Sequence, residues 1–271
     1  NAVFARGCFG EISVAFFQQQ SDHDVLPPRL VAIKTILNCT TFVDKRCKMR
    51  SDVVREIEAL QKLQDHPNIV HLVGLYPAKN DRYALSLVFY YTPTDLHFTM
   101  EWRRRNLMPL LSLVTIQKIA KDLFAALSHC HSHSLVHNDV KPGNLLITTS
   151  GTVQLCDFGL AAPIGSDTTD RRGLCTLFYR SPELLLELSG SDSNPKSDVY
   201  GAALVIAELI TGRTLFRGSS VLDQLHIVLD HLGTPPPNEN GLTFVPKEAQ
   251  PIAAYIPRAT ESPHLLDFLG R

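Results

Sequence analysis

A histidine, a carboxylate, a cation and a carboxamide lie within eight residues near the middle of the chain. The segment 135–147 reads Leu-Val-His137-Asn-Asp139-Val-Lys141-Pro-Gly-Asn144-Leu-Leu-Ile. Asp139 can accept a hydroxyl proton while Lys141 neutralises a transferring phosphoryl group, and Asn144 can hold a metal ion. The alternative is a polar surface turn in which His137 is a cap and Asp139 pairs with Lys141. The context of these residues has to decide between the two interpretations.

The sequence around this segment predicts a loop that is positioned by two strands and a long helix. The apolar run 144–147 predicts one strand, and 152–156 predicts a second strand that ends at Asp157. Asn144 and Asp157 would then lie at neighbouring strand ends, where two oxygen ligands can share one hard cation. A helix over about 115–132 would lead into the loop, with an apolar face of Ile116, Ile119, Leu123, Leu127 and Cys130.

The first sixty residues contain a second set of groups suited to phosphate. Gly7 and Gly10 could let backbone N–H groups approach phosphate oxygens, although a simple hairpin turn explains two glycines equally well. An apolar strand over 30–34 ends at Lys34. Ser51 is predicted to cap a helix that presents Val53, Ile57 and Leu60 on its apolar face.

Composition excludes several classes of protein. The chain has 271 residues, 44% hydrophobic and 20% charged, which is ordinary globular composition. Its net charge of −1 shows no excess of positive charge that would indicate binding to nucleic acid or to a membrane surface. No apolar run approaches the length of a membrane span. The six cysteines form no C-x-x-C pair, which argues against a zinc site or disulfide scaffold and favours reduced thiols in the cytoplasm or nucleus.

The ordered set of motifs resembles the protein kinases. His137 to Asn144 fits the pattern of the catalytic loop, Asp157-Phe-Gly159 fits the magnesium motif, and Tyr179-Arg-Ser-Pro-Glu183 fits the end of the activation loop. The runs 55–60, 66–72, 214–218, 223–225 and 232–235 are similar to the cyclin-dependent-kinase-like (CMGC) group. The resemblance covers essentially the whole chain. It implies an α+β, bilobal fold with a β-rich small lobe over 1–91, a hinge at 92–95 and a mostly helical large lobe over 96–271.

The resemblance also implies the reaction and the role of each residue. ATP with Mg²⁺ would phosphorylate Ser or Thr of a protein substrate: Lys34, paired with Glu56, positions phosphates, Asp139 and Lys141 are catalytic, and Asn144 and Asp157 hold metal. Helical Glu residues are more often solvated surface charges. Asp198 would hold the catalytic-loop backbone, and Arg180 would favour Ser/Thr-Pro targets. The nucleotide site would consist of Ala5, Gly7, Gly10, Ile12, Ala32, Lys34, Phe89, Tyr90, Thr92, Asp95, Leu146 and Cys156.

Several positions depart from the pattern of cyclin-dependent kinases. Of three arginines that bind an activation-loop phosphothreonine, Arg55 is kept, but the others are Asn138 and Ala162, and Arg171 stands at the phosphothreonine position itself. We predict that no activating phosphate is needed there, with Thr168 and Thr169 as alternative acceptors. Cys8 and Phe9 replace the Thr and Tyr of inhibitory phosphorylation, and Ala5 replaces a Gly.

Two questions stay open from the sequence. The chain could be a pseudokinase that scaffolds a partner, an interpretation favoured by Ala5 and Asn138. It could need a cyclin-like regulatory subunit or act as a monomer. We also expect the chain to be truncated after a helix over 262–269, because the family's last helices and the arginine that pairs Glu183 have no counterpart.

Overall fold

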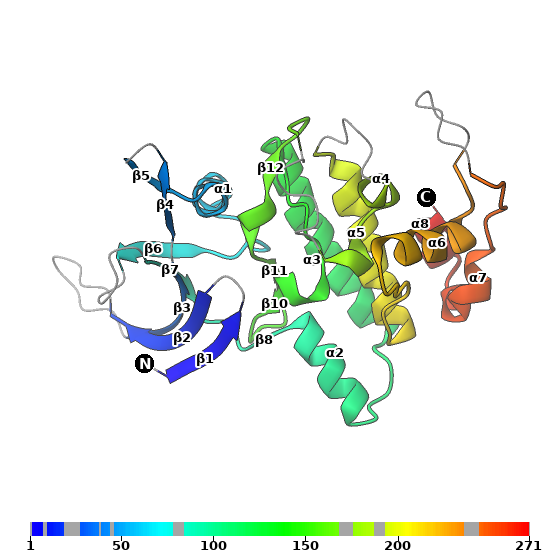
Figure 1. Cartoon of the computed structure of the whole chain (residues 1–271). Coiled ribbons are helices and arrows are strands. Elements are labelled where there is room, and N and C mark those ends of the chain that lie inside the picture. Colours follow the sequence, from blue (N-terminus) through cyan, green and yellow to red (C-terminus); the bar gives the residue numbers. More distant parts are fainter. Residues whose placement is uncertain are drawn as a thin grey trace.

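The molecule consists of a β-rich part and a helical part (Figure 1). The structure is a computed structural model that describes residues 2–7, 10–18, 28–37, 39–43, 46–77, 84–167, 176–186, 193–235 and 244–270. One hydrophobic core runs continuously from helix α1 (Ser51–Lys62) of the first part to helices α3 (Leu113–Ser132) and α5 (Pro195–Thr211) of the second. The predicted α+β, bilobal fold is therefore confirmed.

An antiparallel five-stranded sheet with order β1-β2-β3-β7-β6 forms the small lobe. In β3, Lys34 lies opposite Ile12 of β2 and Leu87 of β7, so its side chain is held in the central strand of the sheet. The predicted strand over 30–34 is confirmed and is longer at both ends. The bounds are β1 (Ala2–Gly7), β2 (Gly10–Phe17), β3 (Arg29–Ile36), β6 (Leu72–Pro77) and β7 (Leu85–Tyr90), with a separate hairpin of β4 (Thr40–Val43) and β5 (Arg46–Met49).

Helix α1 begins one residue earlier than the predicted cap implies. Ser51 is its first helical residue, and the N-cap position is Arg50, whose side chain makes no capping hydrogen bond. Arg50 instead donates to the Asp52 carboxylate, with Nη2 and Oδ2 2.5 Å apart, so a charged pair stabilises the first turn. Val53, Glu56, Ala59 and Leu60 are buried, which places one glutamate on the otherwise apolar face.

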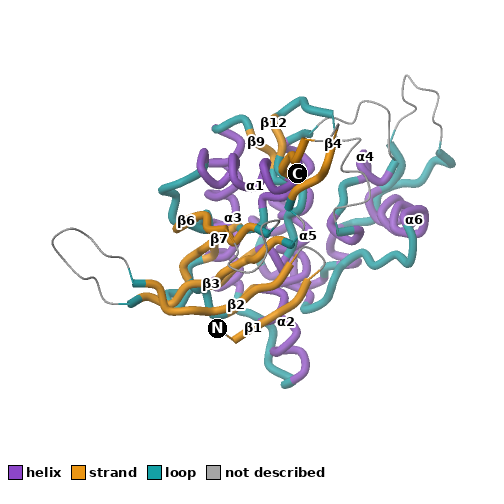
Figure 2. The backbone as a smooth tube through the Cα atoms, turned by 60° about the vertical axis from the view of Figure 1, so that its left-hand side comes forward, coloured by secondary structure: helices purple, strands orange, loops and turns teal. Residues whose placement is uncertain are grey.

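The large lobe is built around the contact between α3 and α5 (Figure 2). Ser112 caps α3 by accepting from Thr115 N at 3.1 Å, and the helix begins at Leu113, two residues before the predicted start. Asn194 caps α5 by accepting from Lys196 N, and Pro195 suits its first turn. The helix ends at Gly212, which has a φ of 74°. The other helices are α2 (Leu96–Arg105), α4 (Pro182–Leu185), α6 (Val221–Leu232), α7 (Ile252–Tyr255) and α8 (Pro263–Gly270).

Short strands and turns lie between the two lobes and carry the motifs. Strands β11 (Val153–Leu155), β10 (Leu145–Ile147) and β8 (Thr94–Asp95) form one sheet, and β9 (Leu135–Val136) pairs with β12 (Ala162–Pro163). Asn68 fastens the small lobe to β11, donating to Val153 O and accepting from Leu155 N, both at 2.8 Å. The 3₁₀ turns are η1 (Pro142–Asn144), η2 (Phe158–Leu160), η4 (Leu177–Tyr179) and η5 (Pro257–Glu261). Within the described part of the chain, no helix has the length and apolar character needed to cross a bilayer.

Three neighbouring histidine rings, of which His66 and His129 are stacked, lie where the segment after α1 meets the end of α3. The ring centroids of His66 and His129 are 4.5 Å apart, and those of His129 and His133 are 4.4 Å apart. Burial lowers the pKa of His66 and of His129 below the usual value of about 6.5. The folded protein therefore holds these rings neutral at a pH where the unfolded chain already binds protons.

This difference in proton binding predicts acid sensitivity. We expect the free energy of unfolding to fall as the pH drops through about 6.5, because protons then favour the unfolded chain. His129→Phe keeps a ring in the stack but does not titrate, so it should remove roughly half of this fall. Urea unfolding at a series of pH values measures the effect, with exposed His264→Phe as the control. A profile for His129→Phe as steep as that of the parent protein would contradict the prediction.

Candidate active site

Asp139 is the carboxylate of the central loop, residues 137–144, and both of its oxygens accept hydrogen bonds. Its side chain is buried, and Oδ2 accepts from Lys141 Nζ at 2.5 Å and from Asn144 Nδ2 at 2.9 Å. Oδ1 accepts from the backbone N and the hydroxyl of Thr176, at 3.2 and 3.3 Å. Lys141 Nζ also donates to Thr176 Oγ1 at 2.8 Å. These contacts fix the carboxylate in one orientation, as a group that receives a proton from a bound hydroxyl requires.

Asp198 of α5 holds the backbone of the loop that carries Asp139. The two Asp198 oxygens accept from the backbone N of His137 and of Asn138, each at 2.8 Å, and His131 Nε2 lies 2.8 Å from Oδ2. Asn138 adopts the left-handed conformation with φ of 65°, which Asn tolerates better than most residues. Asp198 therefore occupies the supporting position that we predicted for it.

His137 links the loop to the next strand. Asp139 N donates to His137 Nδ1 at 3.2 Å, so the ring proton lies on Nε2, which donates to the Cys156 carbonyl at 3.0 Å. The ring also meets Phe158 edge to face, with centroids 4.9 Å apart, and both side chains are fully buried. This fixes the position of the backbone on either side of Asp157.

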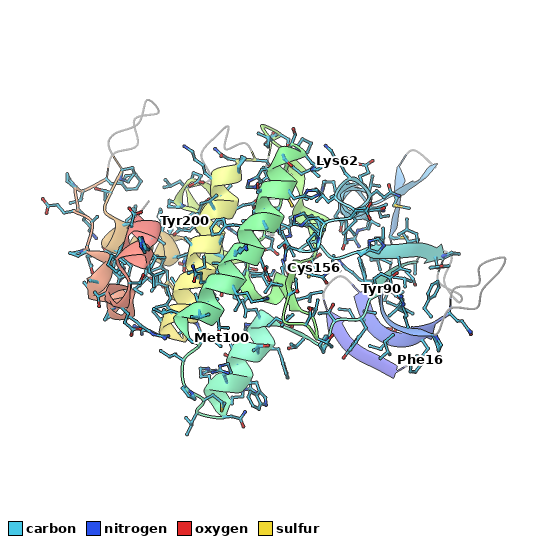
Figure 3. The ribbon with its side chains drawn as sticks, turned by 180° about the vertical axis from the view of Figure 1, so that it is seen from behind. Phe16, Lys62, Tyr90, Met100, Cys156 and Tyr200 are labelled. Atoms are coloured by element: carbon cyan, nitrogen blue, oxygen red, sulfur yellow. The ribbon has the colours of Figure 1, made fainter. Side chains whose placement is uncertain are left out.

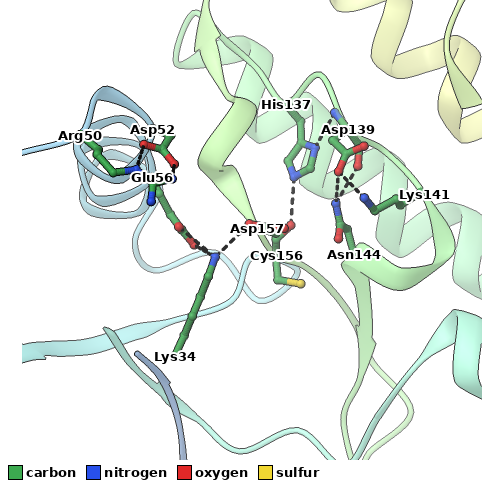
Figure 4. Close-up of polar contacts among 10 residues, drawn as sticks. All are labelled: Lys34, Arg50, Asp52, Glu56, His137, Asp139, Lys141, Asn144, Cys156 and Asp157. Atoms are coloured by element: carbon green, nitrogen blue, oxygen red, sulfur yellow. Dashed lines mark hydrogen bonds and ion pairs between the residues drawn. The ribbon is translucent and has the colours of Figure 1, made fainter. Parts of the chain in front are cut away.

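Lys34 connects the small lobe to the large one (Figure 4). Its Nζ donates to Glu56 Oε1 at 2.6 Å and to Asp157 Oδ1 at 3.0 Å. Burial alone would lower the pKa of Lys34, but the two carboxylates outweigh it and raise the pKa above the usual value, so the ammonium stays charged. Glu56 and not exposed Glu58 is the partner, in agreement with the sequence-based choice.

Asp157 is an accessible anion facing the Asp139 cluster. Burial favours its neutral form, yet Lys34 holds the pKa of Asp157 below its usual value, so it is ionised at neutral pH. Its side chain is 39% exposed, and its backbone has a left-handed φ of 64°, a strained conformation typical of functional sites. Its neighbour Cys156 donates its backbone N to Asn144 O at 3.0 Å, so the two predicted metal ligands lie at adjacent strand ends.

The donor set fits one Mg²⁺ ion that is shared with phosphate. Asn144 uses its Nδ2 to donate to the carbonyl and to the carboxylate of Asp139, which leaves Oδ1 as the atom for a cation. The described residues contain no cluster of three or more His, Cys, Asp or Glu that could hold a metal by themselves. Mg²⁺ commonly takes one carboxylate or two and completes its shell with water and substrate phosphates. Asn144 and Asp157 match this requirement.

A cavity of about 340 Å³ opens between the lobes beside Lys34 and Asp157. Figure 3 shows Cys156 of the large lobe and Tyr90 of β7, which both line it. The predicted nucleotide residues that line it are Ile12, Ala32, Lys34, Phe89, Tyr90, Thr92, Asp95, Leu146 and Cys156. Sequence reasoning missed Val14, Val70, Tyr91, Pro93, Thr94 and Gly143. The hydrophobic alternation of β2, and the position of Tyr91, Pro93 and Thr94 beside or within the hinge, were the signals that could have found most of them.

Comparison with known proteins agrees with this geometry. The protein kinase domain matches residues 9–268. Protein kinase gsk31 of Schizosaccharomyces pombe is 37% identical over 214 residues, which cover 77% of this chain and 52% of that protein. Cell division control protein 2 homolog 3 of Trypanosoma brucei brucei is 38% identical over 186 residues (67% and 56%), and cyclin-dependent kinase 4 of Mus musculus is 33% identical over 220 residues (77% and 71%).

The chain belongs to the protein kinase family. The predicted resemblance to its cyclin-dependent-kinase-like group is confirmed by these relatives. The chain spans about half the length of the first two of them.

The other predicted residues of the kinase domain lie in strands of the small lobe, have a further contact, or fall outside the described residues. Ala5 and Gly7 lie in β1 and Gly10 begins β2, with Ala5 opposite Ile12. Cys8, Phe9, Thr168, Thr169 and Arg171 lie outside the described residues. Asp95 lines the cavity but also caps α2, because its Oδ1 accepts from Phe98 N at 2.7 Å. Asp139 and Lys141 are not part of the cavity lining; Asp139 instead borders a small cavity with Thr176 and Arg180.

Ser181, Ser197 and Glu183 are joined by a chain of hydrogen bonds in this kinase domain. Ser181 is buried, and its hydroxyl donates to Ser197 Oγ at 3.3 Å, which in turn donates to Glu183 Oε1 at 3.0 Å. Glu183 is only partly buried and has this partner. Among the described residues, the Glu183 carboxylate therefore has a hydroxyl partner in Ser197.

Proposed function

We propose that this domain transfers the γ-phosphoryl group of ATP to Ser or Thr hydroxyls of proteins. Lys34 would position the α- and β-phosphates, Asp139 would accept the hydroxyl proton, and Lys141 would neutralise charge on the transferred group. Mg²⁺ held by Asn144 and Asp157 would neutralise the remaining phosphate charge. The observation that carries the proposal is the joint placement of two carboxylates: Asp157 on Lys34 at the nucleotide cavity, and Asp139 in the adjoining loop. We assign residues 1–91 to the small lobe, 92–95 to the hinge and 96–271 to the large lobe.

The rival function is a pseudokinase scaffold, and the charged network argues against it. A binding module has no need for a buried Glu56 that pairs with Lys34, nor for an accessible ionised Asp157 beside it. Lys141 and Thr176 would also have no reason to converge on Asp139.

We further propose that activity does not depend on an activation-loop phosphothreonine. Asn138 stands where an arginine would bind the phosphate, and its Nδ2 donates to Leu160 O at 3.0 Å and to Ser193 Oγ at 3.2 Å. Ala162, at a second such position, is buried and pairs with Val136 between β12 and β9. Neutral hydrogen bonds and packing thus hold the base of the loop where a phosphate and its arginines would otherwise do so.

We propose that the domain prefers Ser or Thr followed by Pro, as its resemblance to the cyclin-dependent-kinase-like group implies. Buried Arg180 supports a preference for Pro after the target residue. A cyclin-like regulatory subunit and a monomeric enzyme are both compatible with helix α1 as described. Light scattering on the protein purified from its source distinguishes these two states by mass.

One experiment tests the proposed activity together with its independence from phosphate. Protein that has been treated with phosphatase, and whose mass confirms that phosphate is absent, should phosphorylate a Ser-Pro peptide with ATP and Mg²⁺, and a Ser-Ala peptide more slowly. Thr168→Ala/Thr169→Ala should retain this activity, and EDTA should abolish it. Activity that appears only after phosphorylation of either threonine would overturn the independence. Activity on neither peptide, phosphorylated or not, would overturn the kinase proposal.

A further inference from the structure

Arg217 is an exposed cation on the surface that adjoins the catalytic loop. It lies in the segment between α5 and α6, and its guanidinium carbon is 5.8 Å from the centroid of the Phe178 ring. Phe178 belongs to turn η4, two residues after Thr176, which contacts Asp139. Arg217 therefore lies on a surface that continues from the position of the acceptor hydroxyl. An extended peptide advances about 3.4 Å per residue, so a side chain a few residues from the acceptor can reach it.

Gln224 of α6 holds the backbone around Arg217 in place. This fully buried side chain accepts from Gly218 N at 2.7 Å and donates to Phe216 O at 3.3 Å and to Phe178 O at 3.5 Å. Gly218 has no space for a side chain, because a Cβ there would lie 2.3 Å from Gln224 N. One side chain thus locks the residues on both sides of Arg217 to the turn that carries Phe178.

Turn η4 is also fixed from its other side. The Tyr179 hydroxyl donates to the Glu208 carboxylate of α5, and burial together with this anion raises the pKa of Tyr179 above the usual range. The Phe178 ring is therefore a stable platform under the guanidinium. A cation over an aromatic face loses less freedom when it binds an anion, since its position is already restricted.

The charge of Arg217 is available to a ligand. None of the ion pairs formed among the described residues involves Arg217. The nearest acidic residue along the following helix, Asp223, instead accepts from the backbone N and the hydroxyl of Ser219. Arg217 thus presents an unneutralised fork of donors that matches the geometry of a carboxylate.

We propose that Arg217 selects protein substrates that carry an acidic residue close to the phosphorylated Ser or Thr. The inference rests on the proposed kinase activity and adds a specificity determinant to it. The guanidinium would bind the substrate carboxylate while the acceptor hydroxyl faces Asp139. The contact is formed at a partly solvated surface, so its effect should be modest and should weaken with salt.

The test is a set of Ser-Pro peptides in which each of the four positions before the acceptor, and each of the three positions after the Pro, carries Glu, Ala or Lys in turn. At one position or more, Glu should raise kcat/KM about fivefold over Ala, the effect of one exposed ion pair. Arg217→Ala should bring this ratio to about one, and Arg217→Glu should favour Lys at the same position. Exposed Arg213→Ala, with the same change of charge nearby, should keep the fivefold ratio.

The ratio separates specificity from a structural role. If Arg217 only stabilised Phe178, Arg217→Ala would lower kcat/KM for all peptides equally and leave the ratio at five, which would overturn the inference. A parent protein that phosphorylates the Glu, Ala and Lys peptides equally would also overturn it and leave the kinase proposal intact. Phosphorylation of none of them would instead refute the kinase proposal on which the inference rests.

Discussion

Asp139→Asn should lower kcat about 10²- to 10⁴-fold, the usual contribution of a general base. The amide is the same size as the carboxylate but cannot accept a proton at neutral pH. It also turns an N–H₂ group toward donors, because Lys141, Asn144 and Thr176 all donate to this side chain. The KM for ATP should change little, because Asp139 does not line the nucleotide cavity. Steady-state kinetics with a Ser-Pro peptide measure both quantities.

The matched control for this variant is Asp230→Asn. Asp230 lies on α6, pairs with Lys247, and lines neither the nucleotide cavity nor the small cavity beside Asp139. The substitution is the same, from a carboxylate to an amide, and the kcat of the Asp230→Asn protein should stay within about twofold of the parent value. Undiminished activity of Asp139→Asn would remove the proposed mechanism, whatever the control does.

Asp198→Ala should have the largest effect on stability. Its carboxylate is fully buried and accepts from two backbone N–H groups and a histidine ring. Their loss leaves buried donors unsatisfied, at about 1–3 kcal/mol each, so the free energy of unfolding should fall by at least about 3 kcal/mol. The loop that carries Asp139 would also lose its support, and kcat should fall about 100-fold through misplacement alone.

Urea unfolding and steady-state kinetics of the same Asp198→Ala preparation check both parts of this prediction. Asp198→Asn should be intermediate, because its single oxygen can still accept from one of the two backbone N–H groups. An unfolding midpoint equal to that of the parent protein would show that Asp198 does not contribute this free energy of unfolding. Normal kcat in a destabilised variant would show that the loop keeps its geometry without it.

The sequence predicted the parts of the fold and site that local pattern determines. Strand β3 ending near Lys34 and the apolar face of α3 both followed from periodicity. Asn144 was placed in a strand, yet it ends turn η1, because Pro142 favours a helical turn at that point. The first residue of α1 was missed because the Arg50 and Asp52 pair took over the role of a serine cap.

Contacts between distant segments could not be read from periodicity. The Thr176 contact with Asp139 spans 37 residues, and the Asn138 contact with Ser193 spans 55. Each depends on how the chain returns to the same loop after long excursions, which hydrophobic spacing does not encode. The predicted role of Asp198 came from family resemblance, since a buried acid in an apolar helix has no local explanation.

Because one ammonium group serves two anions, Lys34 is a poor position at which to make an inactive control protein. Removing it would leave Glu56, only 4% exposed, without a compensating charge. Helix α1 would then have to shift outward, or the carboxylate would have to take up a proton. An inactive Lys34 variant would therefore differ from the parent protein in conformation as well as in chemistry. An inactive Asp139→Asn protein should keep the parent conformation and remain suitable for capturing partners.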